Sequence, residues 1–171
     1  HTKLWAMMET PRSIIDVGRI AAASDRLAVL VMGTNDLVKE LDAQHLPGRA
    51  PILSALSFAV LSAKAAGLAI IDGVYNDVRD AEGFAAECAQ GRAMGFDGKT
   101  LIHPDQVGPC NAAFSPSDEQ VADARGLIEA FEAAMAEGKG VATHKGKLVE
   151  HLHVTMAEKV LANREAIDAL G

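Results

Sequence analysis

The sequence predicts an α/β protein organised around a parallel β-sheet. Four short apolar runs, each typical of a buried strand, alternate with segments whose apolar residues recur at helical spacing. Glycines close two of the helical segments, as left-handed helix caps do. A regular alternation of strand and helix is typical of parallel strands joined by right-handed crossovers.

The first predicted strand covers residues 4–8 and ends at Glu9. Apolar residues run into this carboxylate, and Thr10-Pro11 follows at once, which ends the strand. Glu9 therefore lies at the carboxyl end of a strand, where α/β folds place their chemistry. Pro11 suits the first turn of a crossover helix, which we expect over residues 12–24.

A second strand with the same arrangement is predicted over residues 27–32, and the polar turn Gly33-Thr34-Asn35-Asp36 follows it. Glu9 and Asp36 are about one βαβ unit apart in the chain, so neighbouring parallel strands would hold the two carboxylates side by side. Such a pair would bind a hard divalent cation. Alternatively, each carboxylate caps a helix or is solvated in a loop.

The elements that follow keep the alternation. In chain order we expect a polar loop over residues 37–50, a helix over 52–66 closed by Gly67, a strand over 68–75, a helix over 80–94 closed by Gly95, and a strand over 98–104. Asp72 lies towards the end of the third strand, and His103-Pro104 ends the fourth.

Residues 1–114, which hold these strands, allow two architectures. Four parallel strands do not close a barrel, yet each is apolar enough to be buried on both faces, so the outer two need covering edges. This part of the chain is either a small open α/β sheet or the second half of an eight-stranded barrel. Because the chain opens with His1 rather than Met, we expect a fragment or a processed piece.

Residues 115–171 form a second part with a different pattern. Ser117 precedes an acidic first turn and an alanine-rich amphipathic helix over residues 120–137. A small hairpin over residues 141–149 turns at Lys145-Gly146, and a final helix follows over residues 151–169. We expect this appendage to pack on a neighbouring subunit.

The composition excludes several classes of protein. The 171 residues are 49% hydrophobic and 23% charged, which excludes a disordered chain, and a net charge of −7 without a basic stripe argues against nucleic acid as a partner. Cys88 and Cys110 match no zinc spacing, so we expect reduced, structural thiols. No apolar run is long enough to span a membrane and no signal peptide is visible, so we expect a cytoplasmic protein.

Five linked motifs resemble one known family. They comprise residues 8–10, 33–37, 69–75, 95–107 and 146–150. Their order and separations are similar to those of the HpcH/HpaI aldolase/citrate lyase family, in the branch of citrate lyase beta subunits and malyl-CoA lyases. The resemblance implies a (β/α)8 TIM-type barrel, of which this chain supplies strands five to eight.

The resemblance also implies a metal and a reaction. Glu9 and Asp36 match the family's Mg²⁺ ligands, and the ion would hold a 2-oxo acid and polarise its carbonyl. The expected function is a magnesium-dependent carbon–carbon lyase that cleaves a β-hydroxyacyl-CoA, such as malyl-CoA or citramalyl-CoA, into a 2-oxo acid and an acyl-CoA. The arginine that helps to stabilise the enolate in the family comes from an early strand, and no residue here matches it.

Several further residues are candidates for substrate binding. Gly33 and Thr34 would offer backbone amides to a carboxylate, and His103-Pro104 resembles the segment that lines the entrance for the pantetheine arm. Asp72 either contacts a metal-bound water or anchors its loop, with anchoring favoured. For His103 the alternative is a structural ring bonded to backbone.

Glu150 occupies the position at which many family members carry a catalytic aspartate that reaches a neighbouring subunit. It is therefore our candidate acid/base in a homotrimer or homohexamer, and the alternative is a solvated carboxylate before the last helix. Because this acid differs from the family's, a malyl-CoA thioesterase on the same fold stays open as a rival function. A noncatalytic half-barrel or assembly subunit is the second rival, because the family's arginine has no match here and the sheet has an open edge.

Overall fold

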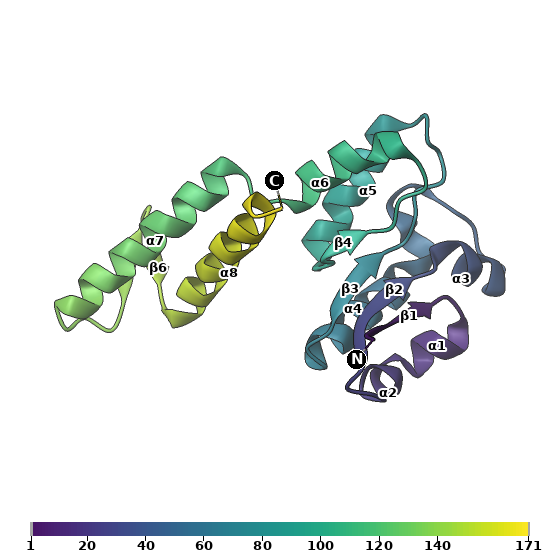
Figure 1. Cartoon of the computed structure of the whole chain (residues 1–171), viewed down its shortest axis with the longest axis horizontal. Coiled ribbons are helices and arrows are strands. Elements are labelled where there is room, and N and C mark those ends of the chain that lie inside the picture. Colours follow the sequence, from purple (N-terminus) through teal and green to yellow (C-terminus); the bar gives the residue numbers. More distant parts are fainter. Residues whose placement is uncertain (1, 171) are drawn as a thin grey trace. The chain divides into compact units, whose positions relative to one another are not determined.

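The computed structural model describes residues 2–170, and the chain divides into two compact units. The first runs to Phe114 and holds a four-stranded sheet with its helices, and the second begins at Ser115 and holds two helices and a hairpin (Figure 1). Within residues 2–170 no helix combines the length and the apolar character needed to cross a membrane. Each unit is described by itself.

The sheet of the first unit is parallel throughout. Its strands are β1 (Leu4–Met8), β2 (Leu27–Met32), β3 (Ala69–Asp72) and β4 (Gly98–Lys99), and they lie in the order β1-β2-β3-β4. Met8 pairs with Met32, so the residues that follow β1 and β2 emerge side by side at the carboxyl edge. The strand order follows the chain order, as expected for successive right-handed crossovers.

Helices cover one face of this sheet. They are α1 (Pro11–Ile15), α2 (Val17–Ala21), α3 (Thr34–Glu40), α4 (Leu53–Ala65), α5 (Ala81–Met94) and α6 (Val107–Phe114), with the 3-10 turns η1 (Pro47–Ile52) and η2 (Pro104–Gln106). Alternate strand residues point into the helix layer, and the most buried of them are Met8, Leu30, Met32 and Ile70.

The strand β1 differs from the expectation of burial on both faces. Trp5 is 65% exposed and Met7 is 48% exposed, whereas Met8 on the other face is 2% exposed. The prediction was wrong for this strand within residues 2–170, because β1 is an edge strand and the helices cover only the face of Met8.

Four other boundaries also differ from the expectations. The helix over residues 12–24 divides into α1 and α2 at Asp16, and the loop expected over residues 37–50 begins as α3, whose buried Leu37 and Val38 anchor it. The third strand is shorter than residues 68–75, and the fourth is reduced to β4, because the chain turns after Lys99 towards η2. The helix α6 was not predicted.

The second unit is a helical pair with a small hairpin. It comprises α7 (Asp118–Ala136), β5 (Ala142–His144), β6 (Lys147–Val149) and α8 (His151–Asp168). Phe131 of α7, Val149 of β6 and Val154 of α8 form its core. The hairpin turns at Lys145 and Gly146 as predicted, and both residues have positive φ.

Candidate functional site

Glu9 stands at the carboxyl end of β1, on the face of the sheet opposite the helices. Strand residues alternate, so Glu9 points away from the helix layer that buries Met8. The neighbouring residue is Gly33, directly after β2, where an added Cβ would lie 2.4 Å from Glu9 Cβ and 2.7 Å from Glu9 Oε2. Gly33 therefore leaves the space that the Glu9 side chain occupies.

Gly33 itself does not offer a free amide. Its N–H donates to the Met8 carbonyl at 3.0 Å and so extends the pairing of β1 with β2. This pairing differs from our expectation that the Gly33 amide is open to a substrate carboxylate. Thr34, the first residue of α3, is 5% exposed, and its side chain lies over Gly73.

Asp36 lies in the first turn of α3, which starts directly after β2. Its side chain is exposed, whereas Glu9 is half-buried. Within the described residues neither carboxylate has a hydrogen bond or an ion pair. A negatively charged side chain is favourable in the first turn of a helix, which agrees with the position of Asp36.

The two carboxylates have the chemistry that a magnesium ion requires. Mg²⁺ binds oxygen ligands and keeps several positions for water or substrate, so two protein carboxylates suffice. The cradle at Gly33 and the absence of protein partners for Glu9 and Asp36 within residues 2–170 agree with this role. No cluster of three or more His, Cys, Asp or Glu side chains suited to a metal occurs in the same range.

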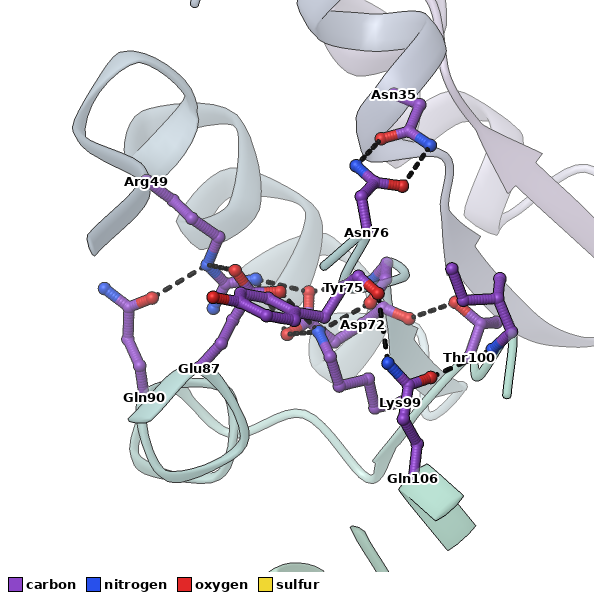
Figure 2. A network of polar contacts seen from close by, with 12 residues as sticks. Asn35, Arg49, Asp72, Tyr75, Asn76, Glu87, Gln90, Lys99, Thr100 and Gln106 are labelled. Carbon is purple, nitrogen blue, oxygen red and sulfur yellow. Dashed lines mark hydrogen bonds and ion pairs between the residues drawn. The ribbon is translucent and has the colours of Figure 1, made fainter. Parts of the chain in front are cut away.

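Asp72, by contrast, points into the helix layer and is fully buried (Figure 2). Arg49 Nη1 lies 2.7 Å from both of its carboxylate oxygens, Lys99 Nζ lies 3.4 Å from Oδ2, and the Gly73 N–H donates to Oδ1. In α5, Gly91 makes room for it, because an added Cβ there would lie 2.8 Å from Oδ2. These are the contacts of the anchoring role that we favoured.

A second carboxylate completes this buried network. Glu87 of α5 accepts from Lys99 Nζ at 2.6 Å and lies 3.7 Å from Arg49 Nε. Two cations and two carboxylates thus balance, which offsets the cost of removing them from water. The network ties η1, β3, β4 and α5 together.

Arg49 reaches the network from a strained turn. Its φ is +58°, directly after Gly48 at +74°, a left-handed conformation that side chains other than glycine adopt rarely. Arg49 Nε donates to Gln90 at 2.7 Å, and Gln90 donates to the Gly48 carbonyl. Arg49 Nη2 is buried without a hydrogen-bond partner among the described residues. The turn is therefore held by its side-chain contacts.

A cavity of about 440 Å³ lies between the start of α3, η1, the β3–α5 loop and α5. Its walls include Thr34, Leu46, Arg49, Tyr75 and Asn76. This volume is in the range of small-molecule sites.

Tyr75 and Asp80 form a hydrogen bond at the rim of this cavity. The Tyr75 hydroxyl donates to Asp80 Oδ2 at 2.5 Å, and this bond, with burial and the charge of Asp80, raises the pKa of Tyr75 to about 12. The same bond lowers the pKa of Asp80. The Tyr75 hydroxyl therefore acts as a donor to Asp80.

The two cysteines are buried in one apolar cluster. Burial raises the pKa of Cys88 to about 12 and also raises the pKa of Cys110. Both are free thiols, as expected. Their raised pKa values argue against a nucleophilic role.

His103 and Pro104 begin η2 at the surface. His103 Nδ1 accepts from the Asp105 N–H at 3.2 Å, so the ring is bonded to backbone and caps the turn. This contact matches the structural alternative for His103. Pro104 takes the first position of the turn.

Glu150 is exposed at the start of α8 in the second unit. It caps that helix, and its N–H donates to His153 Nδ1 at 3.0 Å. Upstream, Asp123 holds the hairpin through His144 Nε2 at 2.8 Å and Lys145 Nζ at 2.7 Å. The hairpin thus fixes the position of Glu150 within the second unit.

Sequence reasoning missed Arg49, Glu87 and Lys99. One signal for them was available: Asp72 lies two residues after Ile70, so both point into the helix layer, and a buried carboxylate there requires cations. Which cations supply it depends on contacts between distant segments, which the sequence pattern does not reveal.

Comparisons with known proteins identify a family and several relatives. The HpcH/HpaI aldolase/citrate lyase family matches residues 1–104. A (3S)-malyl-CoA thioesterase of Cereibacter sphaeroides (strain KD131 / KCTC 12085) is 52% identical over 97% of this chain and 58% of its own length. The citrate lyase subunit beta of Escherichia coli (strain K12) is 36% identical over 96% of this chain and 54% of its own length.

A solved structure is similar over both units. Protein CitE from Mycobacterium tuberculosis, in complex with magnesium, acetoacetate and coenzyme A, has a TM-score of 0.80 and 30% identity, over 95% of this chain and 61% of that chain. The chain therefore spans somewhat more than half the length of the relatives it matches.

Proposed function

The chain belongs to the HpcH/HpaI aldolase/citrate lyase family, and we propose that it forms part of a magnesium-dependent thioesterase that hydrolyses a malyl-CoA-like thioester. The observation that carries this proposal is the difference in identity between two kinds of relative. Thioesterases are 50–52% identical to the chain, whereas citrate lyase beta subunits are 31–36% identical.

The expectation of a carbon–carbon lyase is corrected by this difference. The family resemblance is confirmed, but the relatives of the chain include both thioesterases and citrate lyase beta subunits, so the family alone does not decide the reaction. The rival reading of a malyl-CoA thioesterase is therefore the one that we propose.

The parallel sheet, with helices covering one face and an exposed edge strand, supports a further proposal. We propose that β1 to β4 are strands five to eight of a (β/α)8 barrel, with the face of Glu9 directed to its interior. The carboxyl edge would then be the floor of the active site. The second unit would pack on a neighbouring copy in a trimer or hexamer.

In this proposal Glu9 and Asp36 hold Mg²⁺. When bound there, the ion would act as a Lewis acid that polarises a substrate oxygen. Gly33 keeps the space for the Glu9 side chain, and Thr34, packed on Gly73, fixes the start of the helix that carries Asp36. The cavity beside Thr34 and Asn76 would give room to part of the substrate.

Hydrolysis requires water to add to the thioester carbonyl carbon and the carbon–sulfur bond to break. The products are a carboxylic acid and a thiol, so one proton leaves the water and one reaches the sulfur. We propose that Glu150 of a neighbouring copy moves this proton, because it is an exposed carboxylate at the start of α8, directly after the hairpin. In this proposal activity would require assembly, because the acid/base would come from a neighbouring copy.

Product analysis tests the proposed reaction. The natural protein that contains this sequence is incubated with (3S)-malyl-CoA and Mg²⁺, and free thiol, malate, glyoxylate and acetyl-CoA are measured. We expect thiol and malate in equal amounts, and loss of both when EDTA removes the metal. Glyoxylate and acetyl-CoA without free thiol would contradict the proposal, and no turnover would favour the noncatalytic alternative.

A further inference from the structure

Two asparagines join the loops that follow neighbouring strands. Asn35 Nδ2 donates to Asn76 Oδ1 at 2.9 Å, and Asn76 Nδ2 donates to Asn35 Oδ1 at 2.7 Å. Figure 2 shows the two amides facing each other, Asn35 from the first turn of α3 and Asn76 from the β3–α5 loop. Each amide thus uses one donor and its acceptor in a closed two-bond pair.

The pair is exposed to solvent, so the two amides are not forced to bond each other by burial. A second contact lies beside it: the Thr34 side chain covers Gly73, where an added Cβ would lie 2.3 Å from Thr34 Oγ1. Two consecutive residues of α3 are therefore fixed to the chain that follows β3. The next residue is Asp36.

The helix that carries Asp36 is held by Thr34 on Gly73 and by the buried Leu37 and Val38, but it has no capping side chain. It is short, and its N-cap, Gly33, provides no side-chain hydrogen bond. Without a capping side chain the first N–H groups of the helix lack partners, so contacts from its side chains must hold its first turn. The amide pair supplies the lateral restraint that a capping side chain would otherwise give.

From this arrangement we infer that Asn35 and Asn76 are positioning residues that hold Asp36 in place for its divalent cation, an inference that rests on the proposed metal site. Mg²⁺ demands close to ideal octahedral geometry, so a ligand on a loose helix start binds it less well. Neither asparagine needs to touch the ion.

The test measures Mg²⁺ affinity by calorimetry, and Mn²⁺ binding by electron paramagnetic resonance, in the natural protein. We expect Asn35→Ala and Asn76→Ala each to weaken binding by about threefold to tenfold, the range for loss of hydrogen bonds of ordinary strength. The double variant should bind the metal no more weakly than either single variant, since each single substitution already removes the whole amide pair. Asn111→Ala, an exposed asparagine of α6, is the matched control and should bind like wild type.

Two further measurements separate the outcomes. The unfolding temperature of both variants should stay close to that of wild type, whereas a merely structural pair would lower it and leave metal affinity unchanged. Asp36→Asn is measured beside them. If wild type binds and Asp36→Asn does not, but both asparagine variants bind like wild type, only this inference is overturned. If wild type fails to bind the metal, the proposed site and the inference are both overturned.

Discussion

Acidic side chains near the carboxyl ends of the strands of the first unit fall into two groups, one buried with cationic partners and one without protein partners among the described residues. Asp72 represents the first group, and Glu9 and Asp36 form the second. Asp72 is fully buried and meets Arg49 and Lys99, so its charge is neutralised inside the protein. Glu9 and Asp36 face the other way or lie at the surface, and within the described residues they have no partner. The difference indicates that the first group stabilises the fold and that the second is available to a ligand.

Asp72→Asn should have the largest effect on stability. The change keeps the shape but removes the charge that compensates Arg49 and Lys99, and breaking a buried ion pair costs about 3–5 kcal/mol. We expect the free energy of unfolding, measured by urea titration, to fall by about that amount. A loss near zero would show that the network contributes nothing to stability.

The same substitution at Asp36 should have the opposite profile. Asp36→Asn removes a metal ligand from an exposed position, so we expect Mg²⁺ affinity to fall by about 100-fold, roughly 3 kcal/mol. Unfolding in urea should change by no more than about 0.5 kcal/mol. If Asp36→Asn destabilised the protein as much as Asp72→Asn, the distinction between the two groups would be lost.

Gly33→Ala should disturb the pair of Glu9 and Asp36, because it displaces the Glu9 side chain. The new Cβ would lie 2.4 Å from Glu9 Cβ, so the side chain must move, at a cost of about 1–3 kcal/mol in stability and a measurable loss of Mg²⁺ affinity. Gly18→Ala in α2 is the control, because nothing lies within 4 Å of its added Cβ. The control should stabilise the protein by up to about 1 kcal/mol. Equal effects of the two changes would contradict the packing argument.

Asp123 represents a third case, a carboxylate that is paired but solvated, and its effect should be the smallest. Hydrogen bonds from Lys145 and then His144 lower its pKa below 3.8. A depressed folded-state pKa stabilises above the unfolded value and is lost as pH falls through the lower folded value. At pH values above about 4 we expect Asp123→Asn to cause a small decrease in the melting temperature of the second unit. The difference from wild type should vanish in stronger acid. A difference that grows in acid would refute the pairing.

Local patterns predicted much of the fold. The run of residues 27–32 is strand β2, and the helix ends at Gly67 and Gly95 have the expected positive φ. Where burial depended on distant segments, the predictions were wrong. The start of α3 looked like a polar loop because its apolar contacts, Leu37 and Val38, are only two residues in a polar stretch.

The candidate site likewise has residues that local sequence predicts and contacts that depend on distant segments. The position of Glu9 follows from one strand and its end, and Asp36 follows from the next strand, so both are readable from the sequence. The partners of Asp72 come from η1, β4 and α5, and the pairing of Asn35 with Asn76 joins two loops. Such contacts arise from the three-dimensional fold, and no short motif encodes them.

A crystal structure of the natural protein grown with Mg²⁺ would test the central claim most directly. The account predicts one ion with carboxylate oxygens of both Glu9 and Asp36 at about 2.0–2.1 Å, while Asp72 keeps its bonds to Arg49 and Lys99. An ion bound at Asp72, or Glu9 and Asp36 too far apart to share one ion, would contradict it.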